Sequence, residues 1–354
     1  MFSKQEEELS REFLMTYFPK PSGEIRGIIE KKKYERDLSI IVCCYNQEAY
    51  LKKCLESVAH YPFKRNVSVI VVDDGSTDGS AEIADSYGKL PDFIIAHQEN
   101  HGIAYTRNKG ISLCDAKYLF FLDADDYLIP EAVEQMLEYA VSEDADIVES
   151  SYRILRPEEE EPSTEFFADT VDTFEKIPWH RLSGYVWGKV MRTDLFSSLC
   201  FPEGYLMEDG IMGFLVAPLC RRVFRYKISS YIYRMNPAGI TANIQQDSRA
   251  VHSYWILETC LRAMPGLGIE MDENLFEKAL HWIIMNYAII RFQSDNVKTA
   301  VFILLCGCMR EENYRFSANN RSLRLLQEAL RAEDYQLYQQ SCELAWKAGM
   351  YGVK

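Results

Sequence analysis

The chain has 354 residues, of which 47% are hydrophobic and 26% are charged, and its formal net charge is −14. This length suits roughly two domains with a large buried core. The acidic balance argues against a nucleic-acid-binding protein, since such proteins usually carry a basic surface. It does not exclude an anionic substrate, because a metal ion or a few arginines can hold phosphate locally.

The ten cysteines form no Cys-x-x-Cys pair, and several lie in apolar runs. We expect buried free thiols in a reducing compartment, and no zinc site, because no Cys/His cluster has ligand spacing. The charged N-terminus lacks the apolar core of a secretory signal. The longest apolar run, at 300–309, is too short to span a bilayer. The sequence therefore predicts a cytoplasmic protein and leaves attachment to the inner face of a membrane open.

Residues 1–36 predict a charged helical lead-in. Next comes an alternation of apolar runs and helical patterns, with expected strands at 38–46, 67–73, 92–96, 117–123 and 145–150. One expected helix places Leu51, Cys54, Leu55 and Val58 on a single face, and Pro130 opens another. Such an alternation predicts an α/β fold with a mostly parallel sheet and flanking helices.

The second half of the chain has a different character. Residues 156–173 form an acidic, proline-containing insertion that reads as a solvated loop, and residues 174–238 are aromatic and irregular. Helical periodicity follows, so residues 239–354 are expected to form a C-terminal helical region. Its apolar faces, which include Trp282 and Ile289, are expected to be core. A homo-oligomer contact or a peripheral membrane patch stays open as an alternative for these helices.

Polar clusters follow three of the predicted strands, at Tyr45-Asn46, at Asp73-Asp74 and at 123–126. In parallel α/β sheets, ligands bind beyond the carboxyl ends of the strands, so these clusters predict one site. The Asp-x-Asp spacing suits a divalent metal, and its local alternative is an Asx-turn with a helix cap. Arg107 points to the same edge, where it would grip phosphate or be an ordinary surface arginine.

The motifs around these clusters resemble those of family 2 glycosyltransferases, which have the GT-A fold. The matching stretches, in the order and spacing of the family, are "SIIVCCYNQEAYLKKCLESV", "VIVVDDGSTDGS", "ENHGIAYTRNKGI", "YLFFLDADD" and "VWGKVMRTDLF…FPEGYLMEDG". The resemblance covers a domain at 37–238, with a nucleotide-sugar half at 37–150 and an acceptor half at 151–238. Two departures are Cys43-Cys44, where the family usually has Pro-Val, and Gly239, where a serine is common.

The resemblance implies a Rossmann-like GT-A domain that catalyses inverting sugar transfer, assisted by Mn²⁺ or Mg²⁺ and typical of polysaccharide biosynthesis. The donor would be a nucleotide sugar, most simply a UDP-sugar, and the acceptor a hydroxyl of a glycan or lipid-linked molecule. By similarity, the donor nucleotide would contact Tyr45, Glu48, Asp73, Asp74, Arg107 and Asp123. The metal would be held by Asp125, with Asp123 and Asp126 beside it.

The same resemblance assigns roles in the acceptor half. Asp209 would be the general base that deprotonates the acceptor, and Glu208 would orient it. Contacts to the acceptor or the diphosphate would come from Trp187, Lys189 and Arg234. His101 and His180 are read as structural.

The same residues bear on two other functions. A nucleotide-sugar-binding scaffold without turnover would use the acidic insertion and the C-terminal helices as partner surfaces. A nucleotidyltransferase would need a glycine-rich loop after the first strand, and "VCCYNQEAY" has no glycine. Motifs for a dinucleotide oxidoreductase or a P-loop NTPase are also absent from the sequence.

Overall fold

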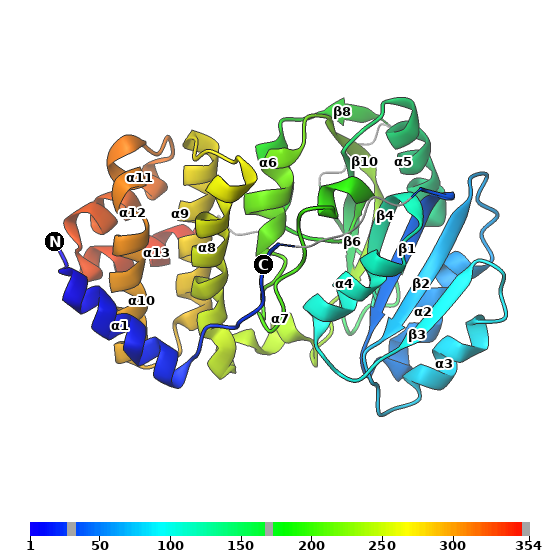
Figure 1. Cartoon of the computed structure of the whole chain (residues 1–354), viewed down its shortest axis with the longest axis horizontal. Coiled ribbons are helices and arrows are strands. Elements are labelled where there is room, and N and C mark those ends of the chain that lie inside the picture. The colour runs from blue at the N-terminus through cyan, green and yellow to red at the C-terminus, as the bar shows by residue number, and fades with distance from the viewer. Residues whose placement is uncertain (27–32, 167–172, 349–354) are drawn as a thin grey trace. The chain divides into compact units, whose positions relative to one another are not determined.

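The computed structural model describes residues 1–26, 33–166 and 173–348 (Figure 1). The chain forms two compact units. The first, called the sheet unit, comprises Ser22–Gly204 and Val216–Pro237. The second, called the helical unit, comprises Met1–Pro21, Tyr205–Leu215 and Ala238–Lys354. The domain boundaries expected at residues 37, 151 and 239 stay predictions.

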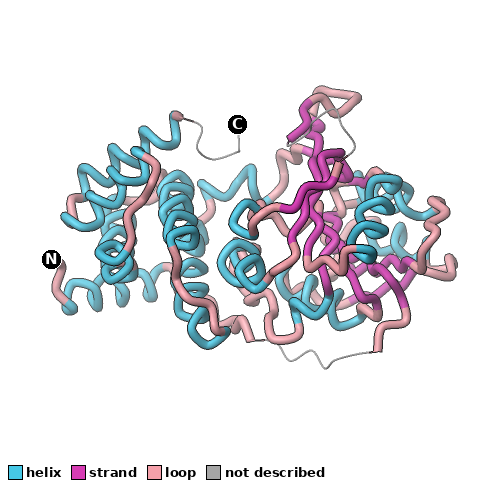
Figure 2. Tube along the Cα trace, turned by 90° about the horizontal axis from the view of Figure 1, so that it is seen from above, coloured by secondary structure: helices cyan, strands magenta, loops and turns pink. Residues whose placement is uncertain are grey.

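The sheet unit begins with four parallel strands in the order β3-β2-β1-β4. Figure 2 shows the strands of the sheet, in magenta, lying side by side. Their bounds are Arg36–Cys44 for β1, Val67–Asp73 for β2, Phe93–His97 for β3 and Ala116–Asp123 for β4. Helices pack on the sheet, so strands β1, β2 and β4 are buried on both faces. Their sequences are therefore continuous hydrophobic runs. The predicted α/β class is confirmed, and polar residues follow the carboxyl ends of these strands.

The sheet continues beyond β4 with antiparallel neighbours. Strand β9 lies between β4 and β6 and pairs antiparallel with both, while β10 pairs parallel with β6. The bounds are Tyr127–Leu128 for β5, Ile147–Leu155 for β6, Thr164–Phe166 for β7, Phe174–Lys176 for β8, Lys189–Arg192 for β9 and Val223–Arg234 for β10.

The expectation that residues 174–238 are irregular is wrong, because β8, β9 and β10 lie there. Strand β10 was missed because it buries residues of both faces and therefore shows no clean alternation. The acidic insertion contributes β7, so it is not entirely a loop, and its residues 167–172 lie outside the described part of the chain.

Helices pack against the strands of the sheet unit. Their bounds are Glu48–Ala59 for α2, Ser80–Tyr87 for α3, Ile103–Leu113 for α4, Pro130–Ser142 for α5 and Ala217–Leu219 for α6, with short 3₁₀ turns η1 at Trp179–Arg181 and η2 at Thr193–Phe196. The predicted apolar face of α2 is confirmed, since all four of its residues are buried. Gly110 allows α4 to approach β1, because a Cβ there would lie 2.3 Å from Ile41.

The helical unit confirms the predicted C-terminal helical region. It contains α1 at Lys4–Tyr17, α7 at Ile240–Asn243, α8 at His252–Ala263, α9 at Glu273–Ile290, α10 at Asp295–Cys308, α11 at Arg310–Arg315, α12 at Arg321–Ala332 and α13 at Tyr335–Lys347. Short turns are η4 at Ile244–Gln246, η5 at Ser248–Val251 and η6 at Met264–Leu267, and a π-helical turn, η3 at Met212–Val216, joins this unit to the sheet unit.

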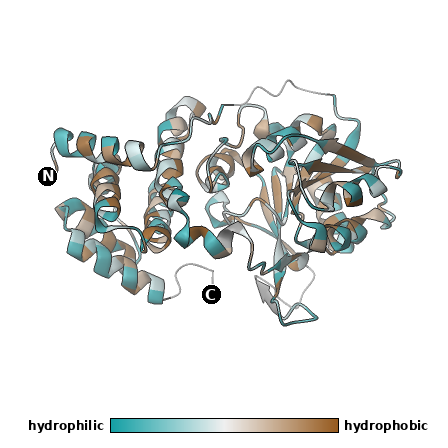
Figure 3. Cartoon of the chain, turned by 90° about the horizontal axis from the view of Figure 1, so that it is seen from below, coloured by the Kyte–Doolittle hydropathy of each residue, from teal (hydrophilic) through white to brown (hydrophobic). Residues whose placement is uncertain are grey.

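Hydrophobic residues concentrate on the strands, whereas the helices alternate hydrophobic and hydrophilic positions (Figure 3). This pattern is typical of helices that cover a core with one face. On α9, Ile289 and Ile290 are buried, as expected for core residues. Among the described residues, no helix combines the length and the hydropathy needed to cross a bilayer.

Ion pairs to a buried glutamate hold the N-terminal segment within the helical unit. Glu258 on α8 is only 2% exposed and pairs with Arg11 and with Lys20 Nζ at 3.0 Å. Burial raises the pKa of Glu258, but the hydrogen bond from Arg11 and the charge of Lys20 outweigh it and lower the pKa to about 2. The ion pairs therefore stabilise the docking of α1 and the segment after it.

Candidate functional site

The loops that follow β1 and β2 are hydrogen-bonded to each other. The amide of Asn46 donates to Ser76 Oγ at 2.9 Å, and the amide of Thr77 donates to Asn46 Oδ1 at 2.7 Å. Asn46 has φ = 51°, a left-handed conformation that asparagine tolerates better than most residues. Next to it, Tyr45 is 46% exposed, so its ring is accessible for stacking on a planar ligand.

Glu48 takes part in the same connection. Its carboxylate accepts a hydrogen bond from the amide of Gly79 at 3.0 Å, and its own amide donates to Asp78 at 3.1 Å. A Cβ on Gly79 would come within 2.8 Å of the Glu48 carboxyl group, so a larger residue there would displace this side chain. Glu48 therefore holds the loop after β2 against the start of α2.

Asp74 is buried at the end of β2 and organises the loop after β3. One carboxylate oxygen accepts from Gln98 Nε2 at 2.7 Å and from the amide of His101 at 2.9 Å. The other accepts from the amide of Gly102 at 2.8 Å. Gly102 precedes α4 with φ = 88°, which favours glycine. The side chain predicted to line the nucleotide pocket is thus bonded to the loop that leads into α4.

Asp73 is also buried and has a partner that sequence reasoning missed. One of its oxygens accepts from the amide of Ser76 at 3.2 Å, and the other lies 3.0 Å from His97 Nδ1. His97 is the last residue of β3, and its other ring nitrogen lies 3.0 Å from Asp85. The hydrogen bonds to Asp73 and Asp85 raise the pKa of His97. A histidine directly after the predicted strand at 92–96 was the available signal.

Arg107 and Asp123 meet beyond β4. Arg107 Nη2 lies 3.3 Å from Asp123 Oδ1, and the guanidinium packs over the rings of Phe121 and Phe201. Arg107 is only 6% exposed, so the surface-arginine alternative is wrong. The structure brings these two predicted residues together, and the arginine offsets part of the negative charge at the strand end.

The other two aspartates of the cluster are bonded to β10 and the residues after it. Asp126 is buried and accepts from the hydroxyl of Tyr231 at 2.7 Å and from the amide of Arg234 at 2.6 Å. Asp125 accepts from Asn236 Nδ2 at 3.0 Å, and its carbonyl accepts from Arg234 Nε at 2.9 Å. Burial and then the charge of a neighbouring aspartate raise the pKa of both carboxyls.

These partners decide how a divalent cation fits the acidic cluster. A carboxyl whose pKa is raised by burial and by like charge gains from a nearby cation. Asp125 is such a carboxyl, and the charge of Asp123 contributes to the rise in its pKa. Mg²⁺ is usually held by one or two carboxylates together with substrate phosphates, so Asp125 with Asp123 suits the ion. Both oxygens of Asp126 already accept hydrogen bonds. In the described parts of the chain, no three or more His, Cys, Asp or Glu side chains form a metal-binding group.

Trp187 and Lys189 lie in the interior of the sheet unit. Trp187 is 8% exposed and stacks on Tyr231, with 4.5 Å between the ring centroids. Lys189 is 1% exposed, and its Nζ lies 3.2 Å from Glu149. Arg225 also pairs with Glu149 at 2.8 Å. These contacts are those of core residues, and the acceptor contacts expected for Trp187 and Lys189 stay predictions.

Glu208 and Asp209 belong to the helical unit, whereas the other candidates belong to the sheet unit. Glu208 is buried and Asp209 is half-buried. The carbonyl of Asp209 accepts from the amide of Met212 at 2.8 Å, where the chain enters the π-helical turn η3. A Cβ on Gly210 would lie 2.8 Å from the ring of Trp282, so glycine permits this packing.

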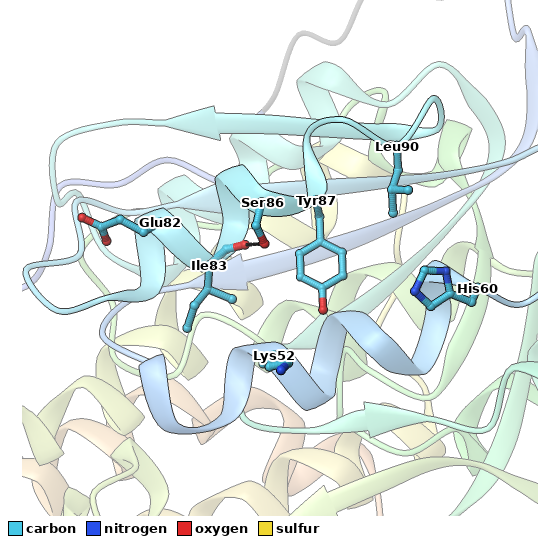
Figure 4. Close-up of a pocket in the computed structure, with 7 residues that line it drawn as sticks. All are labelled: Lys52, His60, Glu82, Ile83, Ser86, Tyr87 and Leu90. Atoms are coloured by element: carbon cyan, nitrogen blue, oxygen red, sulfur yellow. Dashed lines mark hydrogen bonds between the residues drawn. The ribbon is translucent and has the colours of Figure 1, made fainter.

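A surface pocket of about 530 Å³ lies between α2 and α3 (Figure 4). Its lining residues are Lys52, His60, Glu82, Ile83, Ser86, Tyr87 and Leu90. None of the candidate residues lines it.

Comparison with known proteins agrees with the predicted family. Residues 39–189 match the model of the family "Glycosyl transferase family 2". The chain is 32% identical over 224 residues to the putative glycosyltransferase EpsH of Bacillus subtilis, covering 59% of this chain and 64% of EpsH. It is 31% identical over 218 residues to the glycosyltransferase GlyA of Streptococcus pneumoniae, covering 58% of this chain and 31% of GlyA. The chain thus spans less than two thirds of these relatives.

The fold is similar to that of residues 1–349 of S. aureus TarS, solved in complex with UDP-GlcNAc. The TM-score is 0.68 at 18% identity, over 89% of this chain and 93% of that one. The predicted GT-A fold is confirmed.

Proposed function

Because residues 39–189 match the model of glycosyl transferase family 2, we propose that this chain is an inverting glycosyltransferase. The donor is a UDP-sugar, and the acceptor is a hydroxyl of a glycan or of a lipid-linked molecule. One observation carries the proposal. Tyr45, Asp74 and Asp123 lie at the carboxyl ends of the parallel strands β1, β2 and β4, and Arg107 on α4, the helix that follows β3, pairs with Asp123. Ligands of open α/β sheets bind at that edge.

Two similar proteins support the proposed classes of donor and acceptor. TarS, which has a similar fold, is solved with UDP-GlcNAc. The chain is also 27% identical over 222 residues to the minor teichoic acid biosynthesis protein GgaB of Bacillus subtilis. A role in polysaccharide biosynthesis follows as part of the proposal. Self-association through the C-terminal helices, membrane attachment and the cytoplasmic location stay predictions from the sequence.

The residues of the donor site have different proposed roles in binding the nucleotide sugar. Tyr45 stacks on the base, while Glu48, Asp73 and Asp74 hold the loops that surround it. Arg107 keeps Asp123 in place beside the diphosphate. Asp125, with Asp123, would hold Mn²⁺ or Mg²⁺, and the metal would supply positive charge that stabilises the leaving diphosphate.

Arg234 supports the same end of the site. Its guanidinium donates to the carbonyl of Asp125 at 2.9 Å and lies 4.9 Å from the ring of Tyr50. From this position we propose that it closes over the diphosphate. Both oxygens of Asp126 are bonded to the protein, so for Asp126 we propose a structural role in place of the expected share in metal binding.

Asp209 is the proposed general base. In an inverting transfer, the acceptor oxygen attacks the anomeric carbon, the nucleoside diphosphate leaves, and the acceptor proton passes to the base. Asp209 accepts this proton, and Glu208 orients Asp209 or the acceptor.

A donor screen that measures nucleoside diphosphate release tests the proposal, with Mn²⁺ and Mg²⁺ each present or removed. We expect metal-dependent release with at least one UDP-sugar, and a loss of at least about a hundredfold in Asp209→Asn. Glu56→Gln, an acid-to-amide change at an exposed position of α2, is the matched control and should retain full activity. Full transfer by Asp209→Asn would refute the base assignment.

The alternative function, a nucleotide-sugar-binding scaffold, is separated by pairing this screen with calorimetry. UDP binding in the presence of Mn²⁺, combined with no turnover on any donor and acceptor, would favour the scaffold. Absence of both binding and turnover would contradict both functions.

A further inference from the structure

His97 lies between two carboxylates that come from different elements. Its Nδ1 is 3.0 Å from Asp73 at the end of β2, and its Nε2 is 3.0 Å from Asp85 on α3. Asp73 is 3% exposed, whereas the His97 side chain is 43% exposed. Among the described residues, the charged groups that contact the His97 ring are Asp73, from β2, and Asp85, from α3.

The contact at Asp73 continues into the loops of the proposed donor site. Asp73 accepts from the amide of Ser76, and Ser76 Oγ accepts from the amide of Asn46. Asn46 directly follows Tyr45, whose ring is the proposed stacking surface for the base. The backbone of β3 joins the same connection, since the amide of Gln98 donates to the carbonyl of Asp73 at 3.0 Å.

The chemistry of imidazole makes this arrangement depend on its proton. A neutral ring donates from one nitrogen and presents a lone pair from the other. Two ionised carboxylates can therefore both accept only from the doubly protonated ring. When the ring loses a proton, either Asp73 or Asp85 faces a lone pair and is repelled. The pKa of His97 is raised in agreement, because the hydrogen bonds to Asp73 and Asp85 favour the charged form.

We propose that His97 is a positioning residue for the donor site, which in its protonated form fixes Asp73 and the loops carrying Tyr45 and so strengthens nucleotide binding. The inference rests on the proposed function for the identity of the ligand, but the coupling between His97 and the loops does not. The sign is definite: the contribution is present below the pKa of His97 and is lost as the pH rises through it. Because the His97 side chain is 43% exposed to solvent, we expect the loss to match that of an ordinary hydrogen bond, which weakens nucleotide binding about threefold to tenfold.

The first measurement follows the histidines themselves. The chain has 6 histidines, so NMR spectra of histidine-labelled protein can resolve the His97 ring between pH 5.5 and 9. We expect the amide signals of Ser76 and Asn46 to titrate with the midpoint of the ring. Asp85→Asn removes one carboxylate and leaves Asp73 in place, so it should lower that midpoint. If the amide signals of these loops do not shift as His97 titrates, the inference is overturned. This measurement requires no ligand.

The second measurement is the dissociation constant of UDP across the same pH range, for the wild type and for His97→Gln. The ionisation of UDP is the same in both, so the ratio of the two constants isolates the histidine. We expect wild type to bind about threefold to tenfold more tightly near pH 6 and the ratio to approach one near pH 9. Thermal unfolding of each variant checks that it is folded.

The outcomes separate the two claims. A ratio that stays constant with pH overturns the positioning role and leaves the proposed function intact. UDP that binds at no pH contradicts the proposed function, and the loop amides then decide the positioning role alone.

Discussion

Replacing Tyr231 by phenylalanine tests how the acidic loop after β4 is held. The Tyr231 hydroxyl accepts from the amide of Asp123 at 3.1 Å and donates to Asp126 at 2.7 Å. The side chain is fully buried, and its ring stacks on Trp187. Phenylalanine keeps the ring and removes both hydrogen bonds. A bond to a charged group contributes about 1.5–3 kcal/mol and a neutral one about 0.5–1.5 kcal/mol, so the expected loss of stability is about 2–4 kcal/mol.

The assay is urea unfolding of the wild type and Tyr231→Phe at pH 7.5, followed by calorimetry of UDP in the presence of Mn²⁺. We expect a lower free energy of unfolding and weaker UDP binding, because Asp123 and Asp126 lose a shared anchor. Tyr17→Phe removes a hydroxyl from a residue that is 66% exposed, so it serves as the matched control and should change neither quantity.

Two results would refute this reasoning. A change in the free energy of unfolding below about 0.5 kcal/mol would mean that water replaces the hydroxyl at no cost. Unchanged UDP binding in a clearly destabilised protein would mean that the loop keeps its conformation without Tyr231.

Three further predictions concern buried charge. Lys189→Met should cost about 1–3 kcal/mol in urea unfolding, because it removes one partner of buried Glu149 while Arg225 stays paired with it; a stable variant that has lost transfer would instead support an acceptor contact. The pKa of Glu258 is lowered to about 2, so its stabilisation is full above the ordinary value near 4.5 and is lost as the pH falls toward 2. Glu258→Gln should therefore cost on the order of 3 kcal/mol at pH 7 and flatten the acid unfolding curve. Asp125→Asn should raise the free energy of unfolding at pH 8, because it removes a carboxylate whose ionised form is disfavoured by burial, as its raised pKa indicates. It should also weaken Mn²⁺-dependent UDP binding in calorimetry, and a lower free energy of unfolding would contradict the prediction.

The parts of the fold that sequence predicted are those set by local patterns. Strands β1, β2 and β4 appear as apolar runs, and the buried face of α2 repeats with the period of a helix. The position of β9 between β4 and β6 was not predictable in this way, because that pairing joins residues at least 40 positions apart in the chain. The gathering of candidates at one sheet edge was predictable, since it follows from parallel strand direction alone.

The partners of the site residues were not predictable from their motif. The sequence identifies Asp74 as an acid at a strand end, but the same residue type can face a ligand or bond to a loop. Here its oxygens accept from Gln98 and from two backbone amides. His97 was missed for a related reason, because a lone histidine has no spacing signature and gains meaning only when Asp73 and Asp85 are seen on either side.

The three aspartates after β4 illustrate why identity alone does not assign a role. Asp126 accepts two hydrogen bonds from β10, and Asp123 lies beside the guanidinium of Arg107. Asp125 instead accepts from the neutral amide of Asn236, and burial and the charge of Asp123 raise its pKa. A neutral donor offsets less charge than a cation does. The charge of Asp125 is therefore offset less than that of Asp123, and its carboxylate accepts fewer hydrogen bonds than that of Asp126, which is why we place it first among the proposed metal ligands.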